Sequence, residues 1–252
     1  MNERVQKILA RSGYGSRRAC ELFIEQGRVK VNGKVIHLGD KADLQKDTIT
    51  LDDKPINVQQ DFIYIALYKP RGVLSAAYSP EGRQTVCDLI DLPFRLYPVG
   101  RLDIDSEGLI LLTNDGELAN RITHPRYGHE KEYRVLVAKK PDEKQLNNWQ
   151  RGIVLSDGYK TQPAEVDIET IVGRGAWLRV TMREGRKRQI RETGALLGLP
   201  VLRIIRTRIG EVHLGNLKPR QWRYLTREEI KSLKETPNKQ SKKIQKNVSI
   251  GE

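Results

Sequence analysis

The sequence predicts an α+β protein with a small N-terminal domain over residues 1–60, a larger domain over 61–234 and a basic, disordered tail over 235–252. Three observations predict this organisation. Helical spacing of apolar residues precedes a tight hairpin turn in the first segment. In the second, strands alternate with helices of unequal length, which favours an α+β sheet domain over a regular βαβ array. The last segment lacks a periodic apolar face.

The N-terminal domain begins with two short helices. Val5, Ile8 and Leu9 recur at helical spacing, so the first helix is expected to run from about Glu3 to Gly13. Ser16 is a good N-cap for a second helix that ends at Gly27. Valines then alternate with polar residues on both sides of an Asn-Gly pair at 32–33, which predicts a hairpin.

The larger domain reads as strands with interspersed helices. Helices are expected over Thr85–Ile90, Glu117–Ile122 and Pro141–Arg151, with a basic helix from Arg186. The expected strands are 63–68, Gly108–Thr113, Tyr133–Val137, Ala164–Ile171, Trp177–Met182, Val201–Ile209 and Trp222–Leu225.

Charge predicts a polyanionic partner. The chain has 45 Lys and Arg against 32 Asp and Glu, a net charge of +13. No apolar run approaches about 18 residues and no amphipathic Lys/Trp helix stands out, so nucleic acid is favoured and a membrane partner is not expected. A DNA-binding role is disfavoured because the second helix lacks a set of base-reading Asn or Gln side chains.

Cofactor motifs are missing. Cys20 and Cys87 are isolated among apolar neighbours, which suggests a reduced, cytoplasmic protein, and the charged first helix is not a signal peptide. The four histidines form no i, i+4 pair, so no metal is expected. Gly13-Tyr14-Gly15 is not followed by the third glycine of a dinucleotide loop, so no nucleotide cofactor is expected either.

Basic residues cluster in the N-terminal domain. They share the polar face of the first helix, the start of the second helix, where free N–H groups can receive a phosphate, and the hairpin. A solvated helix surface is the alternative interpretation. The predicted RNA-binding residues are Arg4, Lys7, Arg11, Arg17, Arg18, Arg28, Lys30 and Lys34.

Two motifs of the larger domain could carry chemistry. Gly100-Arg101-Leu102-Asp103 presents a carboxylate just before an apolar strand; alone, such a loop is usually a turn with a solvated ion pair. The basic run at 184–191 could turn an arginine inward to hold Asp103 ionised, or could be a solvated face that binds phosphates.

The first 55 residues resemble the S-four type RNA-binding domain, also called the αL motif. The similarity lies in R-V-Q-K-I-L-A-R-S-G-Y-G-S-R-R-A at 4–19 and in G-R-V-K-V-N-G-K at 27–34.

The chain as a whole resembles the ribosomal pseudouridine synthases of the RsuA type over about residues 2–230. The similarity rests on motifs that occur in the family's order: Lys69-Pro70-x-Gly72, Gly100-Arg101-Leu102-Asp103 with Gly108-Leu109, His124-Pro125, Lys131-Glu132-Tyr133, Gly185-Arg186-x-Arg188-Gln189-Ile190-Arg191 and Arg206-Thr207-Arg208-Ile209-Gly210. The resemblance implies a mixed, mainly antiparallel sheet. One departure is Glu192-Thr193-Gly194, where the family commonly has a further arginine and bulky residues.

The resemblance also implies roles for single residues. Asp103 corresponds to the catalytic aspartate, Arg101 to an arginine that fills the space left by the extruded uridine, Tyr133 to the tyrosine that stacks on the base, and Arg191 to the residue that ion-pairs with the aspartate. The remaining candidates are expected to support the site or contact the substrate: Lys69, Arg186, Arg188 and Ile209.

The implied reaction is the isomerisation of a uridine in ribosomal RNA by a monomeric enzyme, with 23S RNA favoured. The N1–C1′ bond is broken, the uracil turns and C5 is joined to C1′, which requires base flipping but no cofactor. Two alternatives stay open: a non-catalytic RNA-binding or ribosome-assembly protein, and the same enzyme acting on 16S RNA.

Overall fold

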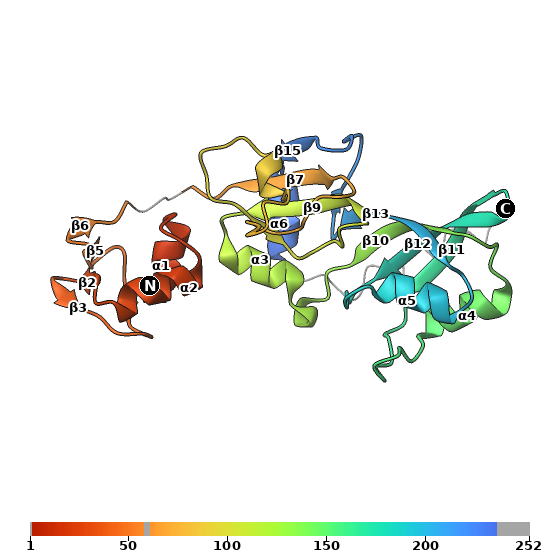
Figure 1. Ribbon diagram of the computed structural model, residues 1–252, viewed down its shortest axis with the longest axis horizontal. Helices are drawn as coiled ribbons and strands as arrows, with labels where there is room; N and C mark the ends of the chain where they lie inside the picture. The colour runs from red at the N-terminus through yellow and green to blue at the C-terminus, as the bar shows by residue number, and fades with distance from the viewer. Residues whose placement is uncertain (1, 58–60, 236–252) are drawn as a thin grey trace. The chain divides into compact units, whose positions relative to one another are not determined.

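The computed structural model describes residues 2–57 and 61–235, which form two compact units divided between Phe62 and Ile63 (Figure 1). Two short segments, Leu92–Arg95 and Asn114–Gly116, belong with the smaller unit. Apart from Glu235, the tail predicted to be disordered lies outside the described residues. In the described ranges, no helix is long and apolar enough to cross a membrane.

The smaller unit contains two helices and six short strands. Its strands form a four-stranded sheet of order β3-β2-β5-β6 and a separate β1-β4 pair. The elements are β1 (Glu3–Arg4), α1 (Val5–Arg11), α2 (Arg17–Glu25), β2 (Val29–Val31), β3 (Lys34–Val35), β4 (Lys41–Ala42), β5 (Ile49–Leu51) and β6 (Lys54–Pro55).

Local sequence signals explain these elements. The Ser16 hydroxyl accepts a hydrogen bond from Ala19 N at 3.1 Å, which confirms it as the N-cap of α2. Asn32 and Gly33 both have positive φ, 51° and 78°, as the two-residue turn between β2 and β3 requires. The apolar face of α1 is buried, as its spacing predicts.

A nine-stranded sheet forms the larger unit. Its order is β11-β12-β10-β13-β9-β7-β15, with β14 paired to β13 and β8 to β9. Every pair is antiparallel except β13 with β9, so the prediction of a mixed, mainly antiparallel sheet is confirmed. The strands are β7 (Tyr64–Lys69), β8 (Tyr97–Val99), β9 (Glu107–Thr113), β10 (Lys131–Val137), β11 (Glu165–Val172), β12 (Gly175–Met182), β13 (Val201–Ile209), β14 (Val212–His213) and β15 (Trp222–Tyr224).

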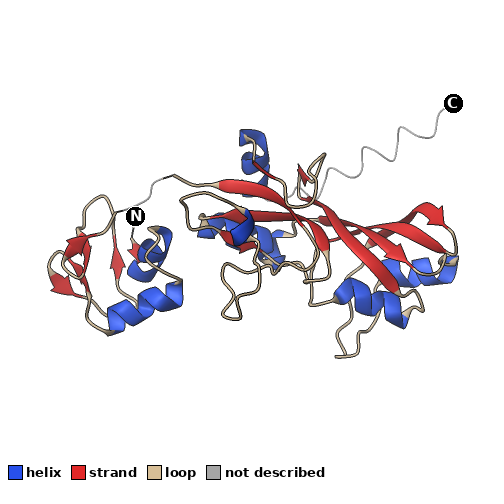
Figure 2. Ribbon diagram, turned by 45° about the horizontal axis from the view of Figure 1, so that its top comes forward, coloured by secondary structure: helices blue, strands red, loops and turns tan. Residues whose placement is uncertain are grey.

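Helices cover this sheet at two places, so the larger unit has two hydrophobic clusters. One joins α3 and α6 to β7, β9 and β13; the other joins α4 and α5 to β10 and β12. Figure 2 shows α4 and α5 beside the end of the sheet that contains β11 and β12. The helical elements are η1 (Cys87–Leu89), α3 (Gly116–Thr123), η2 (Pro125–Tyr127), α4 (Glu143–Arg151), α5 (Gln189–Leu196) and α6 (Arg227–Lys234).

Three helix predictions need correction. The helix expected over Thr85–Ile90 is only the short 3₁₀ helix η1. Pro141 is not in the first turn of α4, because Asp142 caps that helix in a capping box with Gln145. The basic helix begins at Gln189 rather than Arg186, because Arg188 adopts a left-handed φ of 56° that a helix cannot include.

One close backbone approach, between β9 and β13, joins the two halves of the sheet. At Gly108, a Cβ atom would lie 2.3 Å from the carbonyl oxygen of Arg206 on the parallel strand β13, and φ is +106°. Only glycine allows this approach. The pairing places the loop that precedes β9 beside β13 and, through β13, beside β10.

Candidate active site

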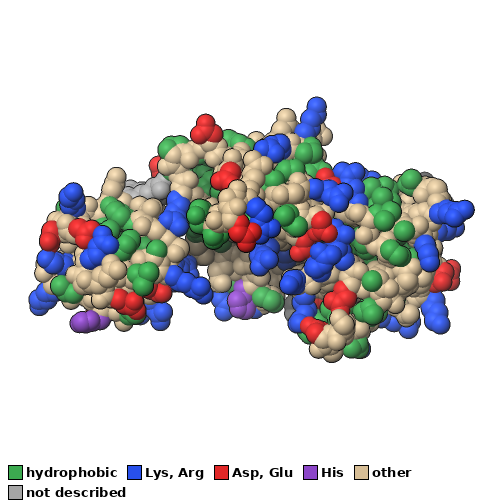
Figure 3. Space-filling model, in the orientation of Figure 1, with side chains coloured by type: hydrophobic (Ala, Val, Ile, Leu, Met, Phe, Trp, Pro, Cys, Tyr) green, Lys and Arg blue, Asp and Glu red, His purple; other side chains and the backbone are tan. Residues whose placement is uncertain are grey.

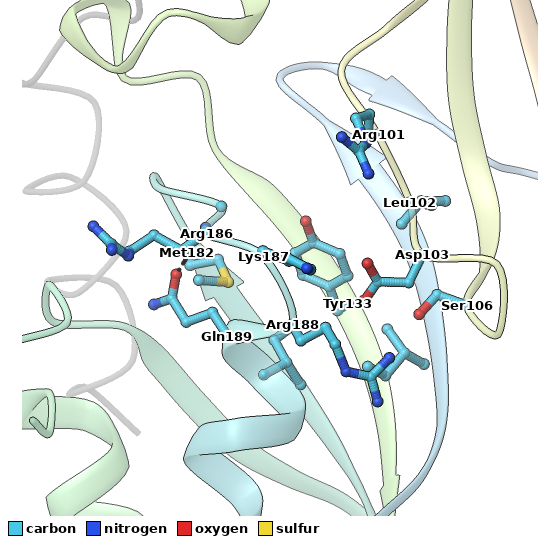
Figure 4. A pocket seen from close by; sticks show the side chains of 13 residues that line it. Arg101, Leu102, Asp103, Ser106, Tyr133, Met182, Arg186, Lys187, Arg188 and Gln189 are labelled. Atoms are coloured by element: carbon cyan, nitrogen blue, oxygen red, sulfur yellow. Dashed lines mark hydrogen bonds between the residues drawn. The ribbon is translucent and has the colours of Figure 1, made fainter. Parts of the chain in front are cut away.

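A cavity of about 250 Å³ lies where the loop before β9 faces β10 and the loop before α5. Asp103 is on one wall and Tyr133 on the other, and the Asp103 carboxylate points toward the Tyr133 ring (Figure 4). Residues from three elements, β12, α5 and β13, and from the two loops complete the lining: Arg101, Leu102, Ser106, Met182, Gly185, Arg186, Lys187, Arg188, Gln189, Ile190 and Ile204.

Lys69 holds the loop that contains Asp103. Its side chain is fully buried at the end of β7, and Nζ donates to the carbonyl oxygens of Asp103 at 3.0 Å and Ser106 at 2.7 Å. Further contacts reach Pro70 O at 3.1 Å and Ile104 O at 3.5 Å. The predicted supporting role of Lys69 therefore takes the form of hydrogen bonds to the backbone of the loop, not of a contact with the Asp103 carboxylate.

Burial lowers the pKa of Lys69 from 10.5 to about 8, while the nearby Asp105 and Asp103 carboxylates oppose this shift. Lys69 is therefore mainly charged at neutral pH and loses its charge under mildly alkaline conditions.

Ser75 supports the same loop from a second side. Its hydroxyl donates to Leu102 O at 2.8 Å and accepts from Leu102 N at 3.0 Å, so it acts as an extra backbone unit beside the loop. No pattern in the sequence identifies Ser75, because its partner is 27 residues away and the pairing depends on the fold.

Tyr133 lies on β10 with only 6% of its surface exposed. It faces Val180 of β12 and Arg206 of β13, and the register of β10 with β13 shifts between Glu132 and Tyr133. Such irregularities re-aim side chains next to functional sites. The shift sets Tyr133 where it lines the cavity opposite Asp103.

Arg191 does not pair with Asp103. Its Nη2 lies 3.2 Å from Oδ2 of Asp105 and 3.2 Å from the Asp105 carbonyl oxygen, and Nη1 donates to Val201 O at 3.3 Å. Arg188 also approaches Asp105, at 3.5 Å. The ion pair expected between Arg191 and Asp103 is thus wrong in this structure, because Asp105, two residues along the same loop, accepts the guanidinium.

Other cations of the cavity differ in how they are held. Arg186 is stacked on the Tyr159 ring at 3.9 Å and paired with Asp157 at 2.6 Å. Arg101 and Lys187 have no Asp or Glu oxygen within 4.0 Å in the described part of the chain. These two side chains are consequently the cations of the cavity most available to a polyanion.

Glu184 anchors the basic loop. This buried carboxylate accepts hydrogen bonds from the Tyr159 hydroxyl at 2.8 Å, Gln162 N at 2.9 Å and Gln189 Nε2 at 2.6 Å. Residues 185–188 therefore form a loop that lines the cavity and is fixed by the contacts of Glu184, and they do not form the first turn of a helix. Figure 3 shows Lys and Arg side chains gathered on this part of the larger unit, around β10 and β13.

Ile209 does not line the cavity that contains Asp103. It is 1% exposed, packs in the cluster under β7 and β9, and lines a second cavity together with Tyr133. Ile204, which the sequence analysis did not select, is the β13 residue that lines the cavity of Asp103. The shift of register beside Tyr133 lies between these two positions of β13.

The predicted RNA-binding residues of the smaller unit fall into two groups. Three are paired with acids: Arg11 with Glu3 at 3.1 Å, Arg28 with Asp52 at 2.6 Å and Lys30 with Asp53 at 2.6 Å. The other five have no acid within 4.0 Å in the described ranges: Arg4, Lys7, Arg17, Arg18 and Lys34.

The site as a whole presents one carboxylate and one aromatic ring inside a rim of cations. A flat base can stack on such a ring while the rim holds the phosphates on either side of it. The carboxylate then has access to the sugar or base of a flipped nucleotide. Within residues 2–57 and 61–235, no three His, Cys, Asp or Glu side chains are close enough to hold a metal ion.

Known proteins are similar to this chain in sequence and fold. The RNA pseudouridylate synthase family model matches residues 63–195 and the S4 domain model residues 3–49. Over 236 residues the chain is 44% identical to an uncharacterized RNA pseudouridine synthase of Aquifex aeolicus, covering 92% of this chain and 94% of that one. Over 236 residues it is 40% identical to ribosomal large subunit pseudouridine synthase B of Bacillus subtilis, covering 92% and 96%. A crystal structure of a pseudouridylate synthase superimposes with a TM-score of 0.66 at 32% identity, covering 91% of this chain and 99% of that chain.

Proposed function

This chain belongs to the RNA pseudouridylate synthase family, and from that premise we propose that it converts a uridine of large-subunit ribosomal RNA to pseudouridine. The observation that carries the proposal is the Asp103 carboxylate facing the Tyr133 ring inside a cationic rim. The name of the Bacillus subtilis relative supports the choice of the large subunit.

In this proposal the target uridine leaves its helix and stacks on Tyr133. Flipping costs a few kcal/mol, of which stacking on an aromatic ring returns about 1–3 kcal/mol. Arg101, two residues before the aspartate and without an acid partner among the described residues, is the side chain placed to fill the vacated space in the RNA. Its side chain lines the cavity and is exposed, which fits a group that reaches into the RNA.

Asp103 then acts as the ionised carboxylate that attacks the nucleotide or takes a sugar proton. The N1–C1′ bond breaks, the uracil turns, and a C5–C1′ bond forms. C5 loses its proton and N1 gains one, so atoms and charge balance without an oxidant. Lys69 and Ser75 contribute by holding the backbone of the loop, which keeps the carboxylate in position.

The smaller unit contributes affinity for the RNA in this scheme, through the five cations that have no acid partner in the described ranges. We further propose that the enzyme acts as a monomer in the cytoplasm. The base pairing and stacking of its RNA substrate must open locally to release the target uridine.

A strain that lacks the protein tests the function. Mapping of pseudouridine in its 23S and 16S RNA should show one or more large-subunit sites missing. The wild-type gene and an Asp167→Asn control, altered on the exposed edge strand β11, should restore them, and Asp103→Asn should not. Persistence of every site in the deletion strain contradicts the proposal, and loss of a 16S site alone assigns the enzyme to the small subunit.

A further inference from the structure

A second cavity of about 150 Å³ adjoins the active site and shares Tyr133 and Arg101 with it. We propose that this cavity binds a phosphate group of the RNA backbone next to the flipped uridine, with Lys131 and Arg206 as its ligands. The inference rests on the proposed function and extends it to a part of the substrate that the active-site cavity does not hold.

Strand register brings the two cations together. Lys131 and Tyr133 are two residues apart on β10, so their side chains project from the same face of the sheet, roughly 6.7 Å apart. Arg206 is the direct partner of Tyr133 on β13. A phosphate between Lys131 and Arg206 would therefore be close enough to a base stacked on Tyr133 to belong to the same or the adjacent nucleotide.

Neither cation has a counter-ion. Lys131 Nζ contacts only the His129 carbonyl oxygen, at 3.4 Å, and has no carboxylate within 4.0 Å among the described residues. Arg206 is 2% exposed; it donates from Nε to Leu109 O at 2.7 Å and from Nη1 to Arg101 O at 3.5 Å. Its Nη2 is buried without a hydrogen-bond partner in the described structure.

The other polar groups of the cavity do not supply the missing charge. Glu184 is the carboxylate of the lining, and Tyr159, Gln162 and Gln189 already occupy it. Burial lowers the pKa of His129 to about 4, so this side chain is neutral. Arg183 is paired with Glu130 at 3.1 Å.

Two adjacent cations with little access to water are costly unless an anion joins them. Burial, reinforced by Arg206, lowers the pKa of Lys131 to about 8, which is the expected response to that cost. A phosphate would supply the charge and accept the unused N–H groups, and the cavity is large enough for one. Since the substrate is RNA, the backbone is the phosphate source that reaches this position whenever a base stacks on Tyr133.

The test compares Lys131→Gln with Lys144→Gln, a control on the exposed face of α4. Binding of a full-length 23S transcript is measured against KCl concentration. Loss of one phosphate contact should lower the slope of log Kd against log salt by about 1 in Lys131→Gln, with no change in the control. Equal slopes in the three proteins overturn the proposal.

A second arm changes the RNA and leaves the protein intact. Oligonucleotides carry the mapped target uridine with a neutral methylphosphonate on its 5′ or its 3′ side. One of the two substitutions should weaken binding by wild type about tenfold and have little further effect on Lys131→Gln. If neither matters in wild type, or if Lys131→Gln loses as much as wild type, the phosphate subsite is refuted.

Free phosphate is the other source of the same chemistry. In that case both neutral linkages would be harmless, and inorganic phosphate would raise the melting temperature of wild type but not of Lys131→Gln; this result also overturns the proposal. The proposed function is tested separately: if it is wrong, no pseudouridine forms when the wild-type protein is incubated with the unmodified RNA. The phosphate subsite is tested by the Kd for RNA binding.

Discussion

Asp103 owes its position to backbone contacts of its loop and not to a cation at its carboxylate. Lys69 binds the loop at Asp103 and Ser75 binds it at Leu102, and Gly108 lets the following strand approach β13. The carboxylate stays open toward the cavity as a result. This arrangement leaves room for a nucleotide between Asp103 and Tyr133 without first breaking an ion pair.

Lys69→Met should lower kcat about 10- to 100-fold, because the loop loses its donors and shifts. The pKa of about 8 also sets a pH dependence. Below this pH the ammonium keeps three donors; above it, the neutral amine keeps two and the positive charge is gone. The kcat of wild type should therefore be full below about pH 8 and fall as pH rises through it.

Single-turnover rates between pH 6.5 and 9.5 measure this step, a range that brackets the shifted pKa. Lys69→Met should lack the step, and Lys131→Gln should retain it. A wild-type rate that is flat across the range, or a step that survives in Lys69→Met, would disprove the assignment to Lys69.

The residues of the site could be selected from the sequence, but their partners could not. The motifs at 100–103 and 184–191 are local patterns, so Asp103, Arg101 and Arg191 were identifiable. Arg191 pairs with Asp105 and not with Asp103. The two carboxylates are two residues apart in one loop, and no pattern of sequence spacing distinguishes them as partners of Arg191. Lys131 and Arg206 stood within the motifs and received no role, because their isolation from acids exists only in the folded sheet.

Among the secondary-structure elements, α5 and the loop before β9 are linked by direct contacts. Arg191 joins them through Asp105, and Gly194 lets the helix lie against the start of β13. A Cβ at Gly194 would be 2.6 Å from Val201 Cγ2 and 2.7 Å from Leu199 O. The departure from the family at 192–194 thus has a packing reason here, and Glu192 is used as well, since it accepts a hydrogen bond from Ser156 N at 2.7 Å.

Arg191→Met should reduce the free energy of unfolding by about 2 kcal/mol, because a partly buried pair loses one member. Asp105→Asn should cost less, and the double variant should cost less than the sum by at least about 0.5 kcal/mol. Urea unfolding of the four proteins measures the coupling. Additive effects would show that the two side chains do not act together.

Arg186→Met is the matched control for this cycle. It also removes an arginine paired with an aspartate, but the pair is exposed, at 43% and 53%. Its cost should stay below about 1 kcal/mol. A larger loss than that of Arg191→Met would assign the stabilising role to the wrong arginine.

Local sequence signals predict the type of most helices and strands, but they do not predict where each one begins and ends. The cap at Ser16 and the turn at Asn32-Gly33 depend on residues within three positions, so the sequence determined them. The start of α5 depends on Glu184 and on its contacts with Tyr159 and Gln162, which come from elsewhere in the chain. Periodicity alone therefore extended the helix back to Arg186. Helix α6, absent from the prediction, begins at a capping box of Thr226 and Glu229 that the sequence does contain.

At the scale of the whole molecule, two units divide the work. The matches to the RNA pseudouridylate synthase and S4 domain models confirm the family that the motifs resembled. Net charge and motif order could reveal this from sequence, because both are sums over the chain. The sequence could not show which cations are paired with acids. Arg28 and Lys30 pair with Asp52 and Asp53, which only the pairing of β2 with β5 brings close to them.

The double variant Arg17→Gln/Arg18→Gln should weaken RNA binding and lower the salt slope by about 2, because both side chains are exposed and neither has an acid partner among the described residues. Arg28→Gln/Lys30→Gln removes the same charge from residues already paired with acids and should change the slope less. Filter binding of 23S transcripts across a salt series compares them. A larger effect for the paired residues would refute this division.

We propose that Asp103 carries the chemistry. Purified wild type, Asp103→Asn and Asp167→Asn are compared on 23S transcripts labelled with tritium at C5 of uridine, with enzyme in excess. Release of tritium should be lost at least about 1,000-fold in Asp103→Asn alone, while its Kd for the transcript stays within about twofold of wild type. Tritium release by Asp103→Asn at the wild-type rate would contradict the account.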